Sequence, residues 1–421
     1  MKTKIIFLLI IIMFMVSGCW DRLEPEDNAI VIGMGFDYNS ETGMYKTIVQ
    51  IASPLTTQGI EVGGVEDKPD YWTVSAWGHT TFDALANIRK KVTRQIHYSH
   101  THIFIISEEL VTEKGIMPVV DALERSRHSR PILLMAIARG DAAEILTANF
   151  PIEALSAKGL RDIIRDTSAE IGSTTIEMAR IFLNKLSRPG IEPIAITLEL
   201  IEEKDNNEGR LNNQESGENE VDTANDENNN IQQATLPGSP PSIRIEGLAA
   251  FRKDQFAGFL DGRETRGWNW TQGTIQRTVL NVESPETEGE WVTIVTRQTY
   301  KKCEPFIRDG EPLIKLTVKA EGRVFGIMGT ATFDKKSELT QSLNQRLAAV
   351  IHNDIEIALD RARVLESDIF GFGNCFYRLH YEQWKEMEEE WSRIFTSLPV
   401  EINVETTIIS LGMINRSLVP R

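Results

Sequence analysis

The first half of the chain alternates between two patterns of apolar residues. Short, β-rich apolar runs predict strands at 26–37, 44–54, 101–110, 132–140 and 191–201. Apolar residues at helical spacing predict helices at 80–92, 116–126, 141–146 and 176–186. Alternation of strands with helices is typical of α/β architecture. We therefore expect an N-terminal α/β domain over 19–200, built as one unit or as two subdomains.

The second half has longer elements. Alternating segments between 243 and 329 predict an antiparallel sheet with one exposed face. Apolar residues then form one stripe along a long helix at 337–366, for which Ser337 is a suitable N-cap. Residues 368–373 interrupt the pattern, a second helix carries Trp384 and Trp391 on one face, and a strand follows from Val400. We expect a C-terminal α+β domain over 241–421, with the helix pair packed on the sheet.

An acidic segment at 201–240 separates these halves. Between 202 and 233 there are ten Asp or Glu, two Lys or Arg, nine Asn and only four apolar residues. Such a segment buries too little apolar surface to offset the entropy of ordering it. We predict a disordered linker or insertion. The alternative is a cation-binding strip, but the carboxylates lack the spacing of a calcium loop. The predicted fold class is thus multidomain α+β or mixed α/β, each domain a mixed or antiparallel sheet with packed helices.

The amino terminus has the layout of a secretory signal. Lys2 and Lys4 precede an apolar run at 5–16, and the small residues Ser17 and Gly18 precede Cys19. The run is twelve residues long, whereas a membrane-spanning helix needs about 20. The positive-inside rule keeps the lysines in the cytoplasm and places the rest of the chain on the other side of the membrane. We predict a signal peptide over 1–18.

The residue at the cut suggests a lipid anchor. The tetrapeptide at 16–19, Val-Ser-Gly-Cys, resembles the lipobox of bacterial lipoproteins. That resemblance implies a diacylglyceryl group on the Cys19 thiol, cleavage between Gly18 and Cys19, and acylation, such as palmitate, of the new amino terminus. Two or three acyl chains give stable anchoring, whereas one gives only marginal binding. A plain secretory signal or an uncleaved short membrane helix are the alternatives.

Composition narrows the function classes. The chain has 421 residues, 41% hydrophobic and 25% charged, which is ordinary for globular protein. A net charge of −16 argues against nucleic acid as a partner, because binding phosphates needs a basic face. With no basic membrane patch apparent in the sequence, the lipid is expected to be the only direct attachment to the bilayer, and no cofactor is expected.

Three residue groups are candidates for a site. His97, His100 and His102 could ligate zinc, although no further ligand at suitable spacing completes a site, and packed histidines beside an apolar strand are the alternative. Cys303 and Cys375 could pair in an oxidising compartment or remain buried thiols. The loop Phe370, Gly371, Phe372 and Gly373 could contact a partner through exposed rings or could fill the core at a tight turn. No Gly-x-Ser-x-Gly elbow or phosphate-binding loop is present, and we predict neither catalytic nor metal-binding residues.

An ordered set of motifs resembles the Ger(x)C family, the lipoprotein C subunits of spore germinant receptors. The set begins with Gly-Cys-Trp-Asp at 18–21 and the turn Gly-Phe-Asp at 35–37. It continues with SHTHIFIISEELVTEKGI at 99–116 and closes with SDIFGFG at 367–373, the Trp-bearing helix and the last strand. The acidic insertion, and Val rather than the commoner Leu at the start of the lipobox, depart from the family pattern.

The resemblance implies a subunit of a complex with integral membrane A- and B-type subunits in the inner membrane of the spore. There the C subunit is on the extracytoplasmic face and is required for nutrient signalling without known catalysis. We therefore expect a non-catalytic, lipid-anchored subunit that acts through protein contacts. The alternative is an extracytoplasmic solute-binding or hydrolase lipoprotein, which would need a concave site with convergent polar groups.

Overall fold

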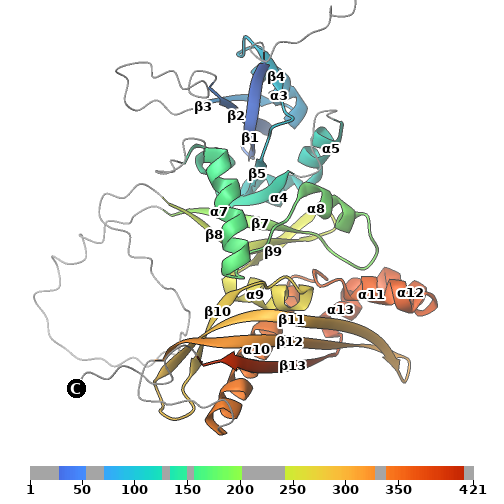
Figure 1. Cartoon of the computed structure of the whole chain (residues 1–421). Helices are drawn as coiled ribbons and strands as arrows, with labels where there is room; N and C mark the ends of the chain where they lie inside the picture. The colour runs from blue at the N-terminus through green and yellow to red at the C-terminus, as the bar shows by residue number, and fades with distance from the viewer. Residues whose placement is uncertain are drawn as a thin grey trace, which may run out of the picture.

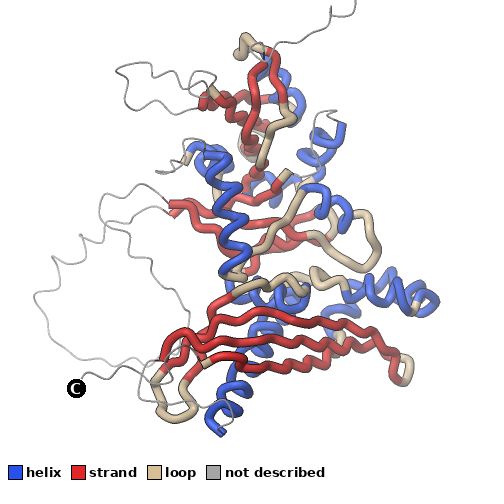
Figure 2. Tube along the Cα trace, in the orientation of Figure 1, coloured by secondary structure: helices blue, strands red, loops and turns tan. Residues whose placement is uncertain are grey.

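The computed structural model describes residues 28–53, 71–125, 133–148, 156–201, 242–327 and 338–411. Two sheets lie one after the other along the long axis of the molecule, with helices packed around and between them (Figure 1). Helices and strands both contribute to each half (Figure 2). The multidomain α+β class predicted from the sequence is confirmed.

The first sheet has nine strands with a parallel centre and antiparallel margins. Its order is β3-β2-β1-β5-β6-β7-β8-β9, and β4 pairs with the first residues of β1. The pairs β1·β5, β5·β6 and β6·β7 are parallel. The strands are β1 Asn28–Asn39, β2 Met44–Ala52, β3 Tyr71–Gly78, β4 Gln95–His97, β5 Ile103–Ser107, β6 Leu134–Arg139, β7 Ile194–Ile201, β8 Ser242–Arg252 and β9 Gln255–Leu260.

Helices cover both faces of this sheet, which explains its apolar central strands. All five residues of β5 are buried, and neighbouring side chains of the strand belong to different core clusters: Phe104 and Ile106 to one, Ile103 and Ile105 to the other. A strand covered on both faces reads as a continuous apolar run rather than an alternating one. The helices are α3 Thr81–Arg89, α4 Glu108–Lys114, α5 Met117–Arg125, α6 Ala142–Thr147, α7 Ser156–Glu170 and α8 Ala179–Leu186.

Strands β8 and β9 correct the predicted assignment of sheets. The sequence placed all β-rich segments from residue 243 onward in a second sheet. Instead β8 pairs antiparallel with β7, with Ile194 opposite Ala250, and β9 continues the same sheet. Leu248 and Ala250 fill the core beside Ile194, so this pairing buries apolar surface at what would otherwise be an exposed edge. The sheets divide after β9, beyond the acidic segment, which lies outside the described residues.

The second sheet has four strands in the order β10-β11-β12-β13. Its strands are β10 Thr278–Glu283, β11 Trp291–Arg308, β12 Glu311–Ile327 and β13 Val400–Ser410, of which only the pair β12·β13 is parallel. The long helix α10 Glu338–Val364 covers one face with the stripe predicted from the sequence. Its buried stripe includes Leu343, Leu347, Ile351, Ile355, Leu359 and Ala362.

Helix α9 Gly262–Gln272 lies between the two sheets and was not predicted. It packs closely on α10, since a Cβ on Gly267 would lie 1.9 Å from the carbonyl oxygen of Asp354. The Asp354 carboxylate is fully buried and accepts from Arg263 Nε at 2.9 Å and Arg266 Nε at 2.7 Å. A buried carboxylate paired with two arginines holds the register between the helices.

The helix predicted after residue 373 is divided in the structure. It consists of α11 Phe372–Leu379, α12 Tyr381–Met387, a 3-10 turn at Glu388–Glu390 and α13 Trp391–Ser397. The helical pattern around Trp384 and Trp391 is correct, because both rings are buried and lie 5.2 Å apart. A single straight helix is wrong, since His380 (φ −137°, ψ 58°) separates α11 from α12 and the 3-10 turn at Glu388–Glu390 separates α12 from α13.

Candidate site at the joint between the two halves

The loop after α10 is organised by one buried carboxylate. Asp368 is 3% exposed, and its two oxygens accept hydrogen bonds from four donors. Three are the backbone N–H groups of the loop and the start of α11, and the fourth is Nε1 of Trp391, all at 2.8–3.1 Å. The side chain therefore caps α11 and ties it to α13.

Two carboxyl groups at this place are shifted toward the protonated form. Burial raises the pKa of Asp368 to about 6, partly offset by the hydrogen bonds from Gly373, Trp391, Phe372 and Gly371. Burial also raises the pKa of Glu192 to about 7, against the bond from Lys253 N, with the Asp368 charge adding to the rise. The Glu192 backbone N–H donates to the Asp368 carbonyl oxygen at 2.9 Å. The two halves of the chain thus meet at a pair of titratable groups.

The segment before β7 packs directly on this loop. Asn374 N donates to the Gly190 carbonyl at 2.7 Å, and its Nδ2 donates to the Pro189 carbonyl at 3.1 Å. Gly190 has φ +68°, and a Cβ there would lie 2.3 Å from the Gly373 carbonyl carbon. Backbone approach this close requires glycine on both sides. The loop is therefore an internal joint.

This geometry decides between the two interpretations of residues 370–373. Phe370 and Phe372 are 7% and 3% exposed, and their rings stack with centroids 5.1 Å apart. They fill the core together with Phe395 and Trp384. The interpretation as core at a tight turn fits the structure, whereas contact with a separate partner through exposed rings does not.

A cavity of about 490 Å³ lies beside the joint. Its lining includes acidic side chains, basic side chains and two tryptophans, and Ser392 is the only hydroxyl residue in it. The lining includes neither cysteine nor histidine, so it offers no nucleophile paired with an imidazole base. Its residues are Leu186, Arg188–Glu192, Lys253, Asp368, Trp384, Glu388, Glu389, Trp391 and Ser392.

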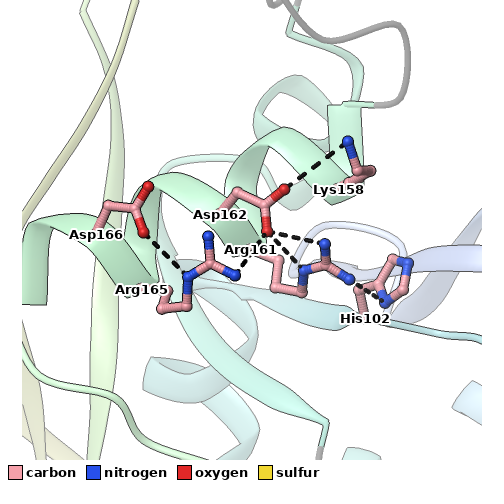
Figure 3. A network of polar contacts seen from close by, with 6 residues as sticks. All are labelled: His102, Lys158, Arg161, Asp162, Arg165 and Asp166. Atoms are coloured by element: carbon pink, nitrogen blue, oxygen red, sulfur yellow. Dashed lines mark hydrogen bonds and ion pairs between the residues drawn. The ribbon is translucent and has the colours of Figure 1, made fainter.

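The three clustered histidines lie near the start of the parallel strands without converging. The rings of His97 and His100 are 6.2 Å apart, while Nδ1 of His102 lies 3.3 Å from Arg161 Nη1 on α7 (Figure 3). Burial, and then the Arg161 charge, lower the pKa of His102. Asp162 in turn binds Arg161. Within the described residues no group of three or more potential metal ligands occurs.

The two cysteines of the C-terminal half lie side by side. Cys303 on β11 and Cys375 on α11 have their Sγ atoms 3.5 Å apart and are both free thiols. The hydrogen bond between them, with burial, raises the pKa of Cys303, and the same hydrogen bond lowers the pKa of Cys375. The sequence left open whether they meet, and the fold brings them into contact.

The predicted lipid site lies outside the described residues, as do Gly18, Cys19 and the signal peptide. In the part of the chain that is described, no helix is both long and apolar enough to cross a membrane. The fold and its joint define a two-sheet α+β protein in which a mixed first sheet is continued, through α9, into a second sheet covered by one long helix.

Comparisons with known proteins find two family models in series, and the second begins within β8, a strand of the first sheet. A family model described as "Spore germination protein N-terminal domain" matches residues 21–200, and one described as "Spore germination B3/ GerAC like, C-terminal" matches 246–412. The residues between them, which include the acidic segment, match neither model.

Relatives align along nearly the whole chain. Spore germination protein KC of Bacillus subtilis (strain 168) is 24% identical over 99% of this chain and 98% of its own, and spore germination protein B3 of the same organism is 20% identical over 99% and 100%. The crystal structure of the GerBC protein shares the fold, with a TM-score of 0.50 and 16% identity over 90% of this chain and 97% of that one. The chain belongs to the Ger(x)C family, which gives it a role in spore germination.

The sequence did not reveal the importance of the joint. The helical pattern predicts a break that begins at Asp368, but it does not indicate the role of this carboxylate, and no pattern marks Gly190. One available signal was the carboxylate directly before a Gly-x-Gly run that opens a helix, since Asp is a favoured helix cap. Nothing local in the sequence marks Gly190, because its requirement comes from a contact with residues about 180 positions away.

Proposed function

We propose that this protein is a non-catalytic, lipid-anchored subunit of a nutrient germinant receptor. It is held at the extracytoplasmic face of the inner spore membrane through Cys19 and acts by contact with integral membrane A- and B-type subunits. The observation that carries this proposal is the order of features: a signal-like segment and Gly-Cys-Trp-Asp at 18–21, followed by both spore germination domains in series.

The fold supports a role in binding rather than chemistry. In the polar site around Asp368, the carboxylate bonds hold α11 to α13, and the bonds of Glu192 to the Asp368 carbonyl and of Asn374 to Gly190 join the two halves of the chain. A carboxylate whose two oxygens are both occupied by backbone and indole donors is a structural group. The protein then supports signalling through contacts with the membrane subunits.

The cavity beside the joint favours a second candidate, an extracytoplasmic solute-binding or hydrolase lipoprotein. Its volume of about 490 Å³ is within the range of small-molecule sites, and it carries both acidic and basic groups. This candidate predicts that a nutrient or cell-wall fragment raises the melting temperature of the purified chain.

The test of the first candidate is deletion of the gene in a strain without a redundant receptor. Spores should form normally but lose or weaken their response to the nutrient, and the wild-type gene should restore it. A normal response in the deletion strain would contradict the proposal. A ligand-induced thermal shift with an unchanged nutrient response would favour the second candidate.

A further inference from the structure

The segment that follows helix α3 is strongly basic although the whole chain is acidic. No Asp or Glu occurs between residues 84 and 107, while Arg89, Lys90, Lys91 and Arg94 fall within six positions. All four are exposed. The net charge of the chain is −16, so this concentration of positive charge is a local feature.

Contacts within the protein use only some of the hydrogen-bond donors of these four side chains. Arg89 lies in the last turn of α3 and Lys90 caps it, where positive charge is favoured by the helix dipole. Arg89 and Lys91 also donate to the backbone carbonyls of Arg94 and Ser75. None of the four forms an ion pair with a carboxylate of the described residues, so their positive charges remain available to an external partner.

The topology puts this segment where the chain leaves the fold toward Cys19. Strand β4 pairs in parallel with the first residues of β1, with Asn28 opposite Gln95, directly after Arg94. Eight residues lie between Cys19 and Asn28, so the nine steps of chain that join them span about 30 Å at most when fully extended. A lipid on Cys19 therefore keeps the basic segment close to the bilayer surface.

An exposed tryptophan lies at the same end. Trp72 is 49% exposed at the beginning of β3, opposite Ile51, which in turn pairs with Val31 of β1. Tryptophan side chains are enriched at membrane–water interfaces, where the ring sits at headgroup level. An aromatic ring beside exposed cations suits such a surface.

The opposite charge lies in the other half of the molecule. In α12 and the turn after it, five glutamates are exposed: Glu382, Glu386, Glu388, Glu389 and Glu390. Figure 1 shows these helices beside the second sheet, far from β4 and α3. An anionic surface attracts the four cations of the basic segment and repels the glutamates of α12 and the turn after it, which would orient the molecule.

We propose that Arg89, Lys90, Lys91 and Arg94 form a headgroup-binding patch that docks the first sheet on anionic phospholipids. The patch directs the joint and the second sheet away from the bilayer. This revises the expectation that the lipid is the only direct attachment to the membrane, and it rests on the proposed anchoring at Cys19.

The test is co-sedimentation of the chain from Trp20 onward with vesicles. The described fold begins at Asn28, so this chain keeps every described contact, and its binding does not depend on lipidation. Vesicles of equal phosphatidylglycerol and phosphatidylcholine are compared with phosphatidylcholine alone. We expect binding to the anionic vesicles only, weakened when the salt concentration rises from about 0.05 to about 0.5 M.

Charge variants separate the patch from the rest of the surface. Each cation near an anionic bilayer is worth roughly five-fold in affinity, so the triple variant Lys90→Gln, Lys91→Gln, Arg94→Gln should bind at least about ten-fold more weakly. Lys90→Arg, Lys91→Arg, Arg94→Lys should bind like the wild type if charge is what matters, and an unchanged melting temperature of the Gln variant excludes an effect of misfolding.

The matched control is Arg277→Gln, Arg323→Gln, Arg378→Gln, three exposed arginines without a described carboxylate partner, and it should leave binding unchanged. Equal binding to neutral vesicles, or equal loss in the control, would overturn the proposal. Absence of vesicle binding, with capture of the membrane subunits lost only in the first variant, would also overturn it and make those subunits the partner. Binding to anionic vesicles with a normal response of Cys19→Ala spores would instead refute the anchoring.

Discussion

Replacing Asp368 by alanine removes the acceptor of four hydrogen bonds from a site that water barely reaches. The donors left behind are three loop N–H groups and the Trp391 indole. An unsatisfied buried donor costs about 1–3 kcal/mol. Against this, the variant no longer buries a carboxylate charge. The rise of the Asp368 pKa from 3.8 to about 6 corresponds to a cost of about 3 kcal/mol for burying that charge. We expect a net loss of about 2–5 kcal/mol in the free energy of unfolding at neutral pH.

The pH dependence of this loss has a definite sign. Because the folded pKa of Asp368 lies above its unfolded value, the folded protein binds more protons between pH 3.8 and about 6, and the stability contribution falls as the pH rises through that window. The variant lacks this titration. The difference between wild type and Asp368→Ala should therefore be about 2 kcal/mol larger at pH 4.5 than at pH 7.5.

The assay is urea unfolding of both proteins at the two pH values, followed by tryptophan fluorescence, because Trp391 reports directly on the site. Hydrogen exchange of the Asn374 amide, which bonds to Gly190, should accelerate in the variant as the joint opens. A difference in unfolding free energy that is constant with pH, or that grows toward neutral pH, would refute the account of a buried, destabilised carboxylate.

Two further substitutions test other contacts. Gly267→Ala places a Cβ against the Asp354 carbonyl and should lower the free energy of unfolding by about 3 kcal/mol or more. The measurement is the melting temperature, which should fall. An unchanged melting temperature would mean that α9 is not packed closely on α10. A mild disulfide oxidant should link Cys303 to Cys375, and mass spectrometry should detect the link as protection of both thiols from alkylation. Cys375→Ser should abolish that protection. If both thiols of the oxidised wild type are still alkylated, the contact of 3.5 Å is wrong.

The elements predicted most accurately are those in which the apolar pattern of the sequence follows directly from which of their own residues are buried. The strand predicted at 101–110 contains β5, but its last three residues begin α4. The stripe predicted at 337–366 is α10, which ends two residues earlier at Val364. The buried residues of α10 repeat at the helical period, and the continuous apolar run of β5 reflects its burial on both faces of the sheet. Local sequence is then sufficient.

The elements that were missed depend on distant parts of the chain. Helix α9 has few aliphatic residues and two glycines, yet Asp261 and Glu264 form a capping box that the sequence does display. The membership of β8 in the first sheet depends on its pairing with β7 across the acidic segment, which no local pattern encodes. The same holds for the joint, because its geometry depends on contacts between residues near 190 and residues near 370.

The central claim is that Cys19 anchors an interaction subunit whose position at the membrane is needed for germination. The most direct measurement is the nutrient response of spores that carry Cys19→Ala in a strain without a redundant receptor, with Cys375→Ser as a control that keeps the anchor. The account predicts that Cys19→Ala spores form but respond weakly or not at all, while the control responds normally. A normal response of Cys19→Ala spores, with the variant present at wild-type level, would contradict it.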